Sequence, residues 1–121
     1  MPKSLTLLVD IDGILCGQIE GDYKNAIPNE KAIETVNRLY DEGYRIILYT
    51  ARFMGRAKGS ARIAREIGYE FTRKQLEGWG VKFHELKMGK PASDVIIDDR
   101  ALFFEPNWDR IYAEVKRKSE D

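Results

Sequence analysis

Asp10 and Asp12 are the first residues in the chain whose types and spacing suggest chemistry. They follow the apolar run 5–9 and precede Gly13, and an apolar run of this length is typical of a buried strand. Because side chains alternate along a strand, we expect both carboxylates to point the same way. Two neighbouring carboxylates repel each other, and a divalent cation, or a proton on one of them, relieves the repulsion. An Asp-x-Asp pair alone is equally compatible with a polar strand end that meets water.

A hydroxyl, a lysine and a second acidic pair come later in the chain. Thr50 follows the apolar run 44–49, Lys90 lies between Gly89 and Pro91, and Asp98 and Asp99 follow the β-branched run 95–97. Alone, each has an ordinary explanation as a turn cap, a solvated lysine or a cap of the next element. Together they supply what phosphoryl transfer through an aspartyl-phosphate requires: a carboxylate nucleophile, an acid to protonate the leaving oxygen, and carboxylates that hold a hard cation. The hydroxyl and the ammonium group would bind the phosphoryl oxygens.

The segments between these residues predict elements that bring them together. Asn29 is a good N-cap for a helix that ends before Gly43 and whose apolar stripe comprises Ala32, Ile33, Val36, Leu39 and Tyr40. A second strand is predicted over 44–49. Strand, helix and strand with short connections form a right-handed parallel unit, whose strand carboxyl ends meet at one edge of the sheet. We therefore expect Thr50 to lie beside Asp10 and Asp12.

The remaining segments predict a flap, two helices and two short strands. The polar stretch 16–28 is expected to form a loop or small flap. Strands are predicted over 81–86 and 95–97, and a helical region from about residue 60 to 79, with a possible kink at Gly68. The predicted apolar stripe of that helix comprises Ile63, Ala64, Ile67, Phe71 and Trp79. A final amphipathic helix is marked by Trp108, Ile111, Tyr112 and Val115.

Length and composition predict a single cytoplasmic domain over residues 1–121. The chain has 20 basic and 20 acidic residues, so its net charge gives no general attraction to nucleic acid or membranes. Cys16 is the only cysteine, which excludes an internal disulfide and fits a reducing compartment. No apolar run has the length of a signal peptide or a membrane span.

Four short motifs resemble, in type and order, those of the haloacid dehalogenase-like superfamily. They are Val9-Asp10-Ile11-Asp12-Gly13, Tyr49-Thr50-Ala51-Arg52, Gly89-Lys90-Pro91 and Ile96-Ile97-Asp98-Asp99-Arg100. Four motifs in order are more specific than any one of them. The stretch 89–101 is also similar, more loosely, to small phosphatases of capsule and surface-polysaccharide synthesis.

The superfamily resemblance implies an α/β fold: a Rossmann-like three-layer sandwich around a central, mostly parallel sheet. It also implies Mg²⁺ and phosphate-ester hydrolysis. By motif position, Asp10 is the nucleophile and a metal ligand, and Asp12 is the general acid/base, with its main-chain carbonyl also on the metal. Thr50 binds the phosphoryl group, Lys90 neutralises it, and Asp98 holds the metal with Asp99 beside it. Lys87 remains an alternative to Lys90, and Asp94 an alternative to Asp98.

The gaps between the motifs are too short for a cap domain, which many members of the superfamily carry. An open crevice admits large substrates or is completed by a neighbouring subunit in a homo-oligomer. We expect Ala51, Arg52 and Arg56, which follow Thr50, to bind the rest of the substrate, because guanidinium groups recognise phosphate and carboxylate.

The leading hypothesis is a Mg²⁺-dependent phosphatase of a small metabolite, a sugar or polyol phosphate of surface-polysaccharide synthesis. The alternative is a capless phosphatase of a macromolecule, either a phosphoprotein or a nucleic-acid end, although aromatic and basic residues do not alternate as nucleic-acid binding favours. A third alternative is a receiver-type phosphoacceptor domain without enzymatic activity. Receivers carry the acceptor aspartate after a mid-chain strand, and this chain has no aspartate between Asp41 and Asp94.

Overall fold

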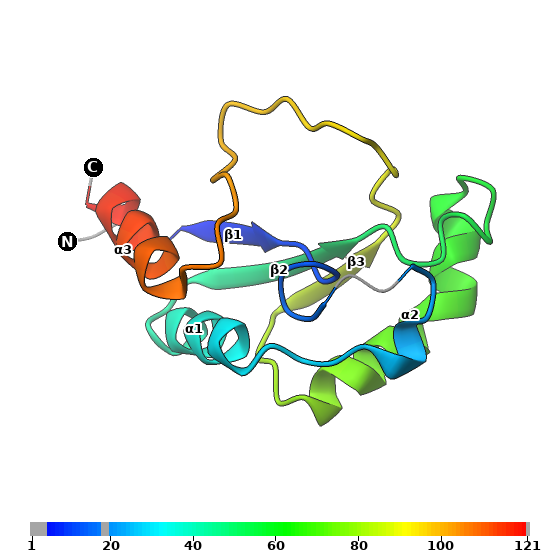
Figure 1. The fold of residues 1–121 in the computed structure, drawn as a ribbon, viewed down its shortest axis with the longest axis horizontal. Coiled ribbons are helices and arrows are strands. Elements are labelled where there is room, and N and C mark those ends of the chain that lie inside the picture. Colours follow the sequence, from blue (N-terminus) through cyan, green and yellow to red (C-terminus); the bar gives the residue numbers. More distant parts are fainter. Residues whose placement is uncertain (1–4, 18–19, 121) are drawn as a thin grey trace.

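The computed structural model describes residues 5–17 and 20–120, and its centre is a parallel sheet of three strands. The strands are β1 (Thr6–Val9), β2 (Arg45–Thr50) and β3 (Glu85–Met88), arranged in the order β1-β2-β3. Val9 pairs with Leu48, and Thr50 pairs with Met88. All three strands therefore end at the same edge of the sheet (Figure 1).

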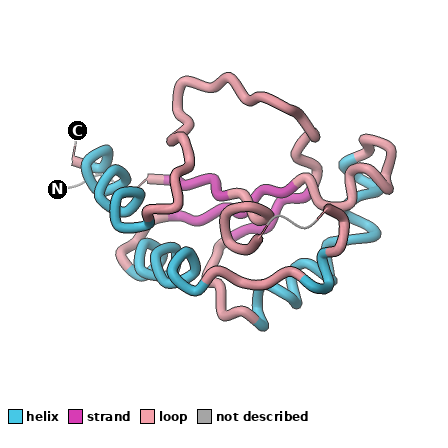
Figure 2. Tube along the Cα trace, viewed as in Figure 1, coloured by secondary structure: helices cyan, strands magenta, loops and turns pink. Residues whose placement is uncertain are grey.

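Three α-helices and one short 3₁₀ helix complete the regular structure (Figure 2). They are η1 (Tyr23–Asn25), α1 (Glu30–Asp41), α2 (Ala61–Gly78) and α3 (Trp108–Ser119). Each α-helix begins after a residue whose side chain accepts a hydrogen bond from the backbone N–H three residues later; these residues are Asn29, Ser60 and Asn107. Such caps satisfy a donor that the first helical turn leaves free. The cap predicted at Asn29 is confirmed.

One face of the sheet carries most of the core. In the central strand β2, Ile46, Leu48 and Thr50 are buried, whereas the alternating residues are exposed or half-buried. Helix α1 buries the apolar stripe predicted for it, except that Tyr40 is only half-buried. Burying a large apolar side chain contributes roughly 1.5–3 kcal/mol, so this face dominates the stability of the sheet.

Helix α2 is continuous, and its buried face differs from the predicted stripe. The buried residues are Ala64, Gly68, Thr72 and Leu76, whereas Ile67 and Phe71 are 50% and 38% exposed. Gly68 therefore does not split the helix. A Cβ atom at this position would lie 2.2 Å from Cδ2 of Phe53, so glycine allows the Phe53 ring to pack against the helix. The buried face includes a glycine and a threonine, which an apolar pattern does not reveal.

The two C-terminal strands predicted from the sequence are corrected by the structure. The third strand is β3, which begins four residues later than position 81. No strand forms over 95–97: the segment 89–107 is an extended connection, and Val95, Ile96 and Ile97 are 74%, 60% and 96% exposed. A strand requires a hydrogen-bonded neighbour. Val95, Ile96 and Ile97 have no partner in the three-stranded sheet of the described residues.

The predicted fold class is confirmed. The described part of the chain is an α/β, Rossmann-like sandwich with a parallel sheet and no cap domain: α1 and η1 separate the first two strands, and α2 separates the second from the third. The predicted C-terminal helix is also confirmed as α3. Within residues 5–17 and 20–120, no helix has the length and apolarity needed to cross a membrane.

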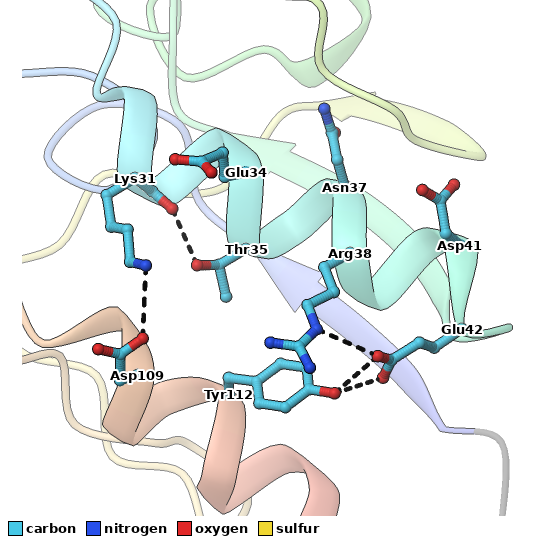
Figure 3. Close-up of a pocket in the computed structure, with 9 residues that line it drawn as sticks. All are labelled: Lys31, Glu34, Thr35, Asn37, Arg38, Asp41, Glu42, Asp109 and Tyr112. Atoms are coloured by element: carbon cyan, nitrogen blue, oxygen red, sulfur yellow. Dashed lines mark hydrogen bonds and ion pairs between the residues drawn. The ribbon is translucent and has the colours of Figure 1, made fainter.

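A polar network attaches α3 to α1 (Figure 3). Glu42, the residue after α1, accepts hydrogen bonds from the hydroxyl of Tyr112 at 2.6 and 2.8 Å. It also forms ion pairs with Lys116 at 3.1 Å and with Arg38 at 3.3 Å, and the Arg38 guanidinium lies 4.1 Å from the centroid of the Tyr112 ring. The hydrogen bond from Tyr112 is the main cause that lowers the pKa of Glu42.

This network should make the stability of the protein depend on pH below the ordinary glutamate pKa of 4.5. Because the pKa of Glu42 is lower in the folded state, its contribution is present above 4.5 and is lost as the pH falls through the folded-state value. Glu42→Gln should lower the free energy of unfolding by roughly 0.5–1 kcal/mol at neutral pH, and the difference should vanish in acid. Urea denaturation at several pH values measures it. Glu34→Gln, on the same helix but outside this network, is the control, and a pH-independent difference for Glu42→Gln would contradict the prediction.

Candidate active site

Asp10 and Lys90 meet at the edge of the sheet where the strands end. Asp10 follows β1 and Lys90 follows β3 by two residues, and the Lys90 Nζ lies 3.3 Å from Oδ2 of Asp10. The Lys90 backbone N–H donates to the carbonyl of Thr50 at 3.1 Å, which ties this loop to the end of β2. The Asp10 side chain is 36% exposed. Asp10 therefore presents a solvent-accessible carboxylate beside a cation.

The contact with Asp10 distinguishes between the two lysines left open by the sequence. Lys87 is an exposed residue within β3, whereas Lys90 is half-buried and paired with Asp10. Gly89, with φ of 95°, turns the chain between them, and a Cβ atom there would lie 2.5 Å from Cβ of Ala61. Glycine thus allows the loop to pass close to the start of α2, so that Lys90 can lie beside Asp10.

Asp12 has a different partner, the guanidinium of Arg52. Arg52 donates from Nε to Oδ2 and from Nη2 to Oδ1 of Asp12, both at 2.9 Å. The Arg52 side chain is fully buried, and that of Asp12 is 17% exposed. The Cys16 thiol also donates to Oδ1 of Asp12 at 3.4 Å. Burial, and next the nearby Asp12 carboxylate, raise the pKa of Cys16 to about 11, so this cysteine stays a thiol and is unsuited to act as a nucleophile.

Arg52 is itself held by residues from two other segments. Its Nη1 donates to Oε1 of Gln75 in α2 at 2.5 Å, and its guanidinium lies 4.7 Å from the centroid of the Tyr23 ring. Gln75 in turn donates from Nε2 to the carbonyl of Tyr23 at 2.6 Å. The flap 16–28 and helix α2 thus meet at the side chain that contacts Asp12. The sequence gives no signal for Gln75 or Tyr23, because both are ordinary residue types far from the motifs.

The residues at the end of β2 and just after it are placed in part as expected. Thr50 is buried, and its hydroxyl oxygen accepts from the backbone N–H of Arg52 at 3.1 Å. Ala51 is half-buried. Arg56 is exposed and donates to the carbonyl of Gly21 in the flap at 3.0 Å. Of the two arginines predicted to bind substrate, only Arg56 has an accessible guanidinium; the burial of Arg52 departs from that expectation.

The structure does not bring the second acidic pair to this edge. Asp98 and Asp99 lie in the exposed segment 89–107, where Oδ1 of Asp98 accepts from the backbone N–H of Arg100 at 2.8 Å. Among the described residues, no group of three or more acidic, histidine or cysteine side chains is arranged to hold a metal ion. The predicted metal ligands Asp10, Asp12, Asp98 and Asp99 are thus not assembled. Asp94 is also exposed in this segment and offers no alternative ligand here.

A groove between α1 and α3 is separate from this edge (Figure 3). Its lining is charged and polar, and includes Lys31, Asp109, Glu42 and Tyr112. None of the predicted site residues lines it. Its side chains largely pair with one another, as in the ion pair between Lys31 and Asp109 at 3.4 Å. We therefore place the candidate site at the strand ends, where carboxylates and cations meet near solvent.

The chain matches no protein-family model and no curated protein. It is similar to the crystal structure of a structural-genomics target from Vibrio cholerae, with a TM-score of 0.74 and 26% sequence identity over 92% of this chain and 98% of that one. It is also similar to a conserved protein from Bacteroides thetaiotaomicron, with a TM-score of 0.54 and 25% identity over 96% and 93% of the two chains. Both likenesses cover nearly the whole of each chain, so they extend over the entire fold.

Proposed function

We propose that this protein is a phosphatase that hydrolyses a small phosphate monoester through an aspartyl-phosphate on Asp10. The observation that carries the proposal is the contact between Asp10 and Lys90 at the edge where the strands end. An accessible carboxylate is a suitable nucleophile, and the neighbouring ammonium group offsets the negative charge of the phosphoryl oxygens. The looser resemblance to capsule and polysaccharide phosphatases favours a sugar or polyol phosphate as the substrate.

The proposed reaction has two steps. In the first, an oxygen of Asp10 bonds to phosphorus, the bond from phosphorus to the ester oxygen breaks, and Asp12, protonated at the start of this step, gives its proton to the leaving oxygen and becomes the carboxylate that Arg52 binds. In the second, water attacks the phosphorus of the aspartyl-phosphate, its proton passes to Asp12, and inorganic phosphate and the free Asp10 carboxylate are released. Lys90 stays beside the phosphoryl oxygens, the Thr50 hydroxyl at the end of β2 is a candidate donor to them, and the exposed Arg56 is available to the remainder of the substrate.

Mg²⁺ is proposed as the cofactor on the strength of the motifs. It would reduce the repulsion between the Asp10 carboxylate and a phosphate dianion. The carboxylates in this structure do not fit a magnesium site, because Asp10 and Asp12 each face a basic side chain and the acidic pair Asp98 and Asp99 lies elsewhere. For Asp98 to share an ion with Asp10, the segment 89–107 would have to take a different course. No step of the proposed reaction is therefore assigned to the metal.

Activity should require Mg²⁺. The test is a screen of phosphorylated sugars, polyols, a phosphopeptide and a 5′-phosphorylated oligonucleotide, with released phosphate as the readout. We expect a small ester to be preferred, EDTA to abolish turnover and Mg²⁺ to restore it. Full activity in metal-free buffer would rule out the cofactor, and a preference for the phosphopeptide or the oligonucleotide would favour the macromolecular alternative, which the absence of a cap leaves sterically open.

The same assay tests whether Asp98 or Asp94, both in the segment 89–107, is a ligand of the proposed Mg²⁺. Asp98→Asn should raise the Mg²⁺ concentration needed for half-maximal activity more than Asp94→Asn does, because Asp98 matches the motif. The two variants are well matched, since both aspartates are exposed in the same segment. The reverse order would reassign the ligand to Asp94.

A further inference from the structure

We infer that Arg52 is a positioning residue, which holds the carboxylate of Asp12 in the orientation that proton transfer requires. The inference deepens the proposed function and rests on it for its kinetic consequence. It replaces the expectation that Arg52 binds substrate. That expectation needs an accessible guanidinium, and the Arg52 side chain is fully buried.

The contact between Arg52 and Asp12 is of the kind that restricts a carboxylate most. Two hydrogen bonds, both 2.9 Å long, join the two nitrogens of one edge of the guanidinium to the two oxygens of Asp12. A single hydrogen bond permits rotation about the Cβ–Cγ bond, whereas a bidentate pair defines the plane of the carboxylate. Because Arg52 is shielded from solvent, salt weakens this pair less than an exposed one.

The guanidinium has little freedom to move with its partner. Its third nitrogen, Nη1, donates to Gln75 at 2.5 Å, and one face packs on the Tyr23 ring. Each guanidinium nitrogen thus has an acceptor, as a buried arginine requires. Tyr23 is held in addition by Gln75 through its carbonyl and by the backbone N–H of Phe53, which donates to its hydroxyl at 3.3 Å. The orientation of Asp12 therefore depends on β2, α2 and the flap together.

A purely structural ion pair would give a different kinetic result. Proton transfer to the leaving oxygen matters for an alkyl phosphate, because an alkoxide is a poor leaving group. It matters little for p-nitrophenyl phosphate, whose phenolate leaves without a proton. Misorientation of Asp12 should consequently slow the first step, release of the leaving group, with the alkyl phosphate and spare that step with p-nitrophenyl phosphate. A general loss of folded protein slows the first step equally with both substrates.

The experiment compares Arg52→Lys with wild type on an alkyl phosphate and on p-nitrophenyl phosphate. Lysine keeps the charge but cannot form the bidentate hydrogen bond. The rate of the first step, measured as release of the leaving group in a single turnover, should therefore fall about 10- to 100-fold for the alkyl phosphate and change much less for the aryl phosphate. Gln75→Leu removes only the support of Arg52 and should shift the ratio of the two rates in the same direction, by less. Arg73→Lys is the matched control: the guanidinium of Arg73, like that of Arg52, binds two side chains, here the carboxylates of Glu70 and Glu77, but on the exposed side of α2.

Equal losses in the rate of the first step with both substrates, in Arg52→Lys and in Gln75→Leu, would overturn the inference. A spectroscopic measurement tests it without activity. In a ¹⁵N-labelled sample, the Nε–H of Arg52 should exchange slowly with water, and Asp12→Asn should shift its signal and speed its exchange. A rapidly exchanging Nε–H in wild type would overturn the inference whatever the assay shows. A wild-type protein that hydrolyses no ester but keeps the protected signal would instead overturn the proposed function and confine Arg52 to a structural role.

Discussion

Asp10→Asn should abolish turnover and leave no phosphorylated protein. The amide has the shape of the carboxylate but lacks the anionic oxygen that attacks phosphorus, and no other carboxylate of the described residues contacts Lys90 in the structure. Acid quenching with a radiolabelled ester, followed by separation of the protein, measures the covalent intermediate. Asp41→Asn is a suitable control, since Asp41 is an exposed aspartate paired with Lys82 at 2.8 Å on the outside of α1. Label retained on the Asp10→Asn protein would show that another residue is the nucleophile.

Asp12→Asn should reduce turnover by roughly two to four decades while leaving the nucleophile intact. The loss arises because asparagine cannot give a proton to the leaving oxygen or receive one from water. With p-nitrophenyl phosphate, which does not need the first of these transfers, phosphorylated protein should accumulate in this variant because hydrolysis of the intermediate still lacks its base. Residual activity equal to that of Asp10→Asn on every substrate would contradict separate roles for the two aspartates.

The same substitution should also destabilise the fold, and this effect must be measured separately. Removal of one partner from a buried ion pair costs about 3–5 kcal/mol because the other charge stays buried and uncompensated. Asparagine retains one acceptor for Arg52, so the loss should be at or below the lower end of that range. Urea denaturation of wild type and Asp12→Asn gives the difference, and assays must be run where both proteins are folded.

Local sequence patterns predicted the first half of the fold well. The cap at Asn29, the stripe of α1 and the strand after it depend on residues within a few positions of one another, and the structure places them within one residue of the prediction. The buried face of α2 could not be predicted in the same way. Gly68 and Thr72 are buried because Phe53 and the sheet approach them, and neither residue type marks a core position by itself.

The absent strand over 95–97 has a related cause. A run of β-branched residues indicates only a preference for an extended backbone. A strand also needs a neighbouring strand with free backbone hydrogen-bonding groups. At the candidate site, parallel topology predicted that residues after β1, β2 and β3 share an edge, which accounts for the contact between Asp10 and Lys90. The direction of the Arg52 side chain depends instead on Gln75 and Tyr23, which lie 23 and 29 positions away in the sequence. No local pattern carries that information.

The strand order β1-β2-β3 also bears on which part of the chain builds the site. The spatial order of the strands is their order in the sequence, so each strand pairs with a strand next to it along the chain. The side chains of the candidate site all come before the segment 89–107 or lie at its start; they are Asp10, Asp12, Thr50, Arg52 and Lys90. The contacts among them therefore involve no residue of α3, which packs against α1.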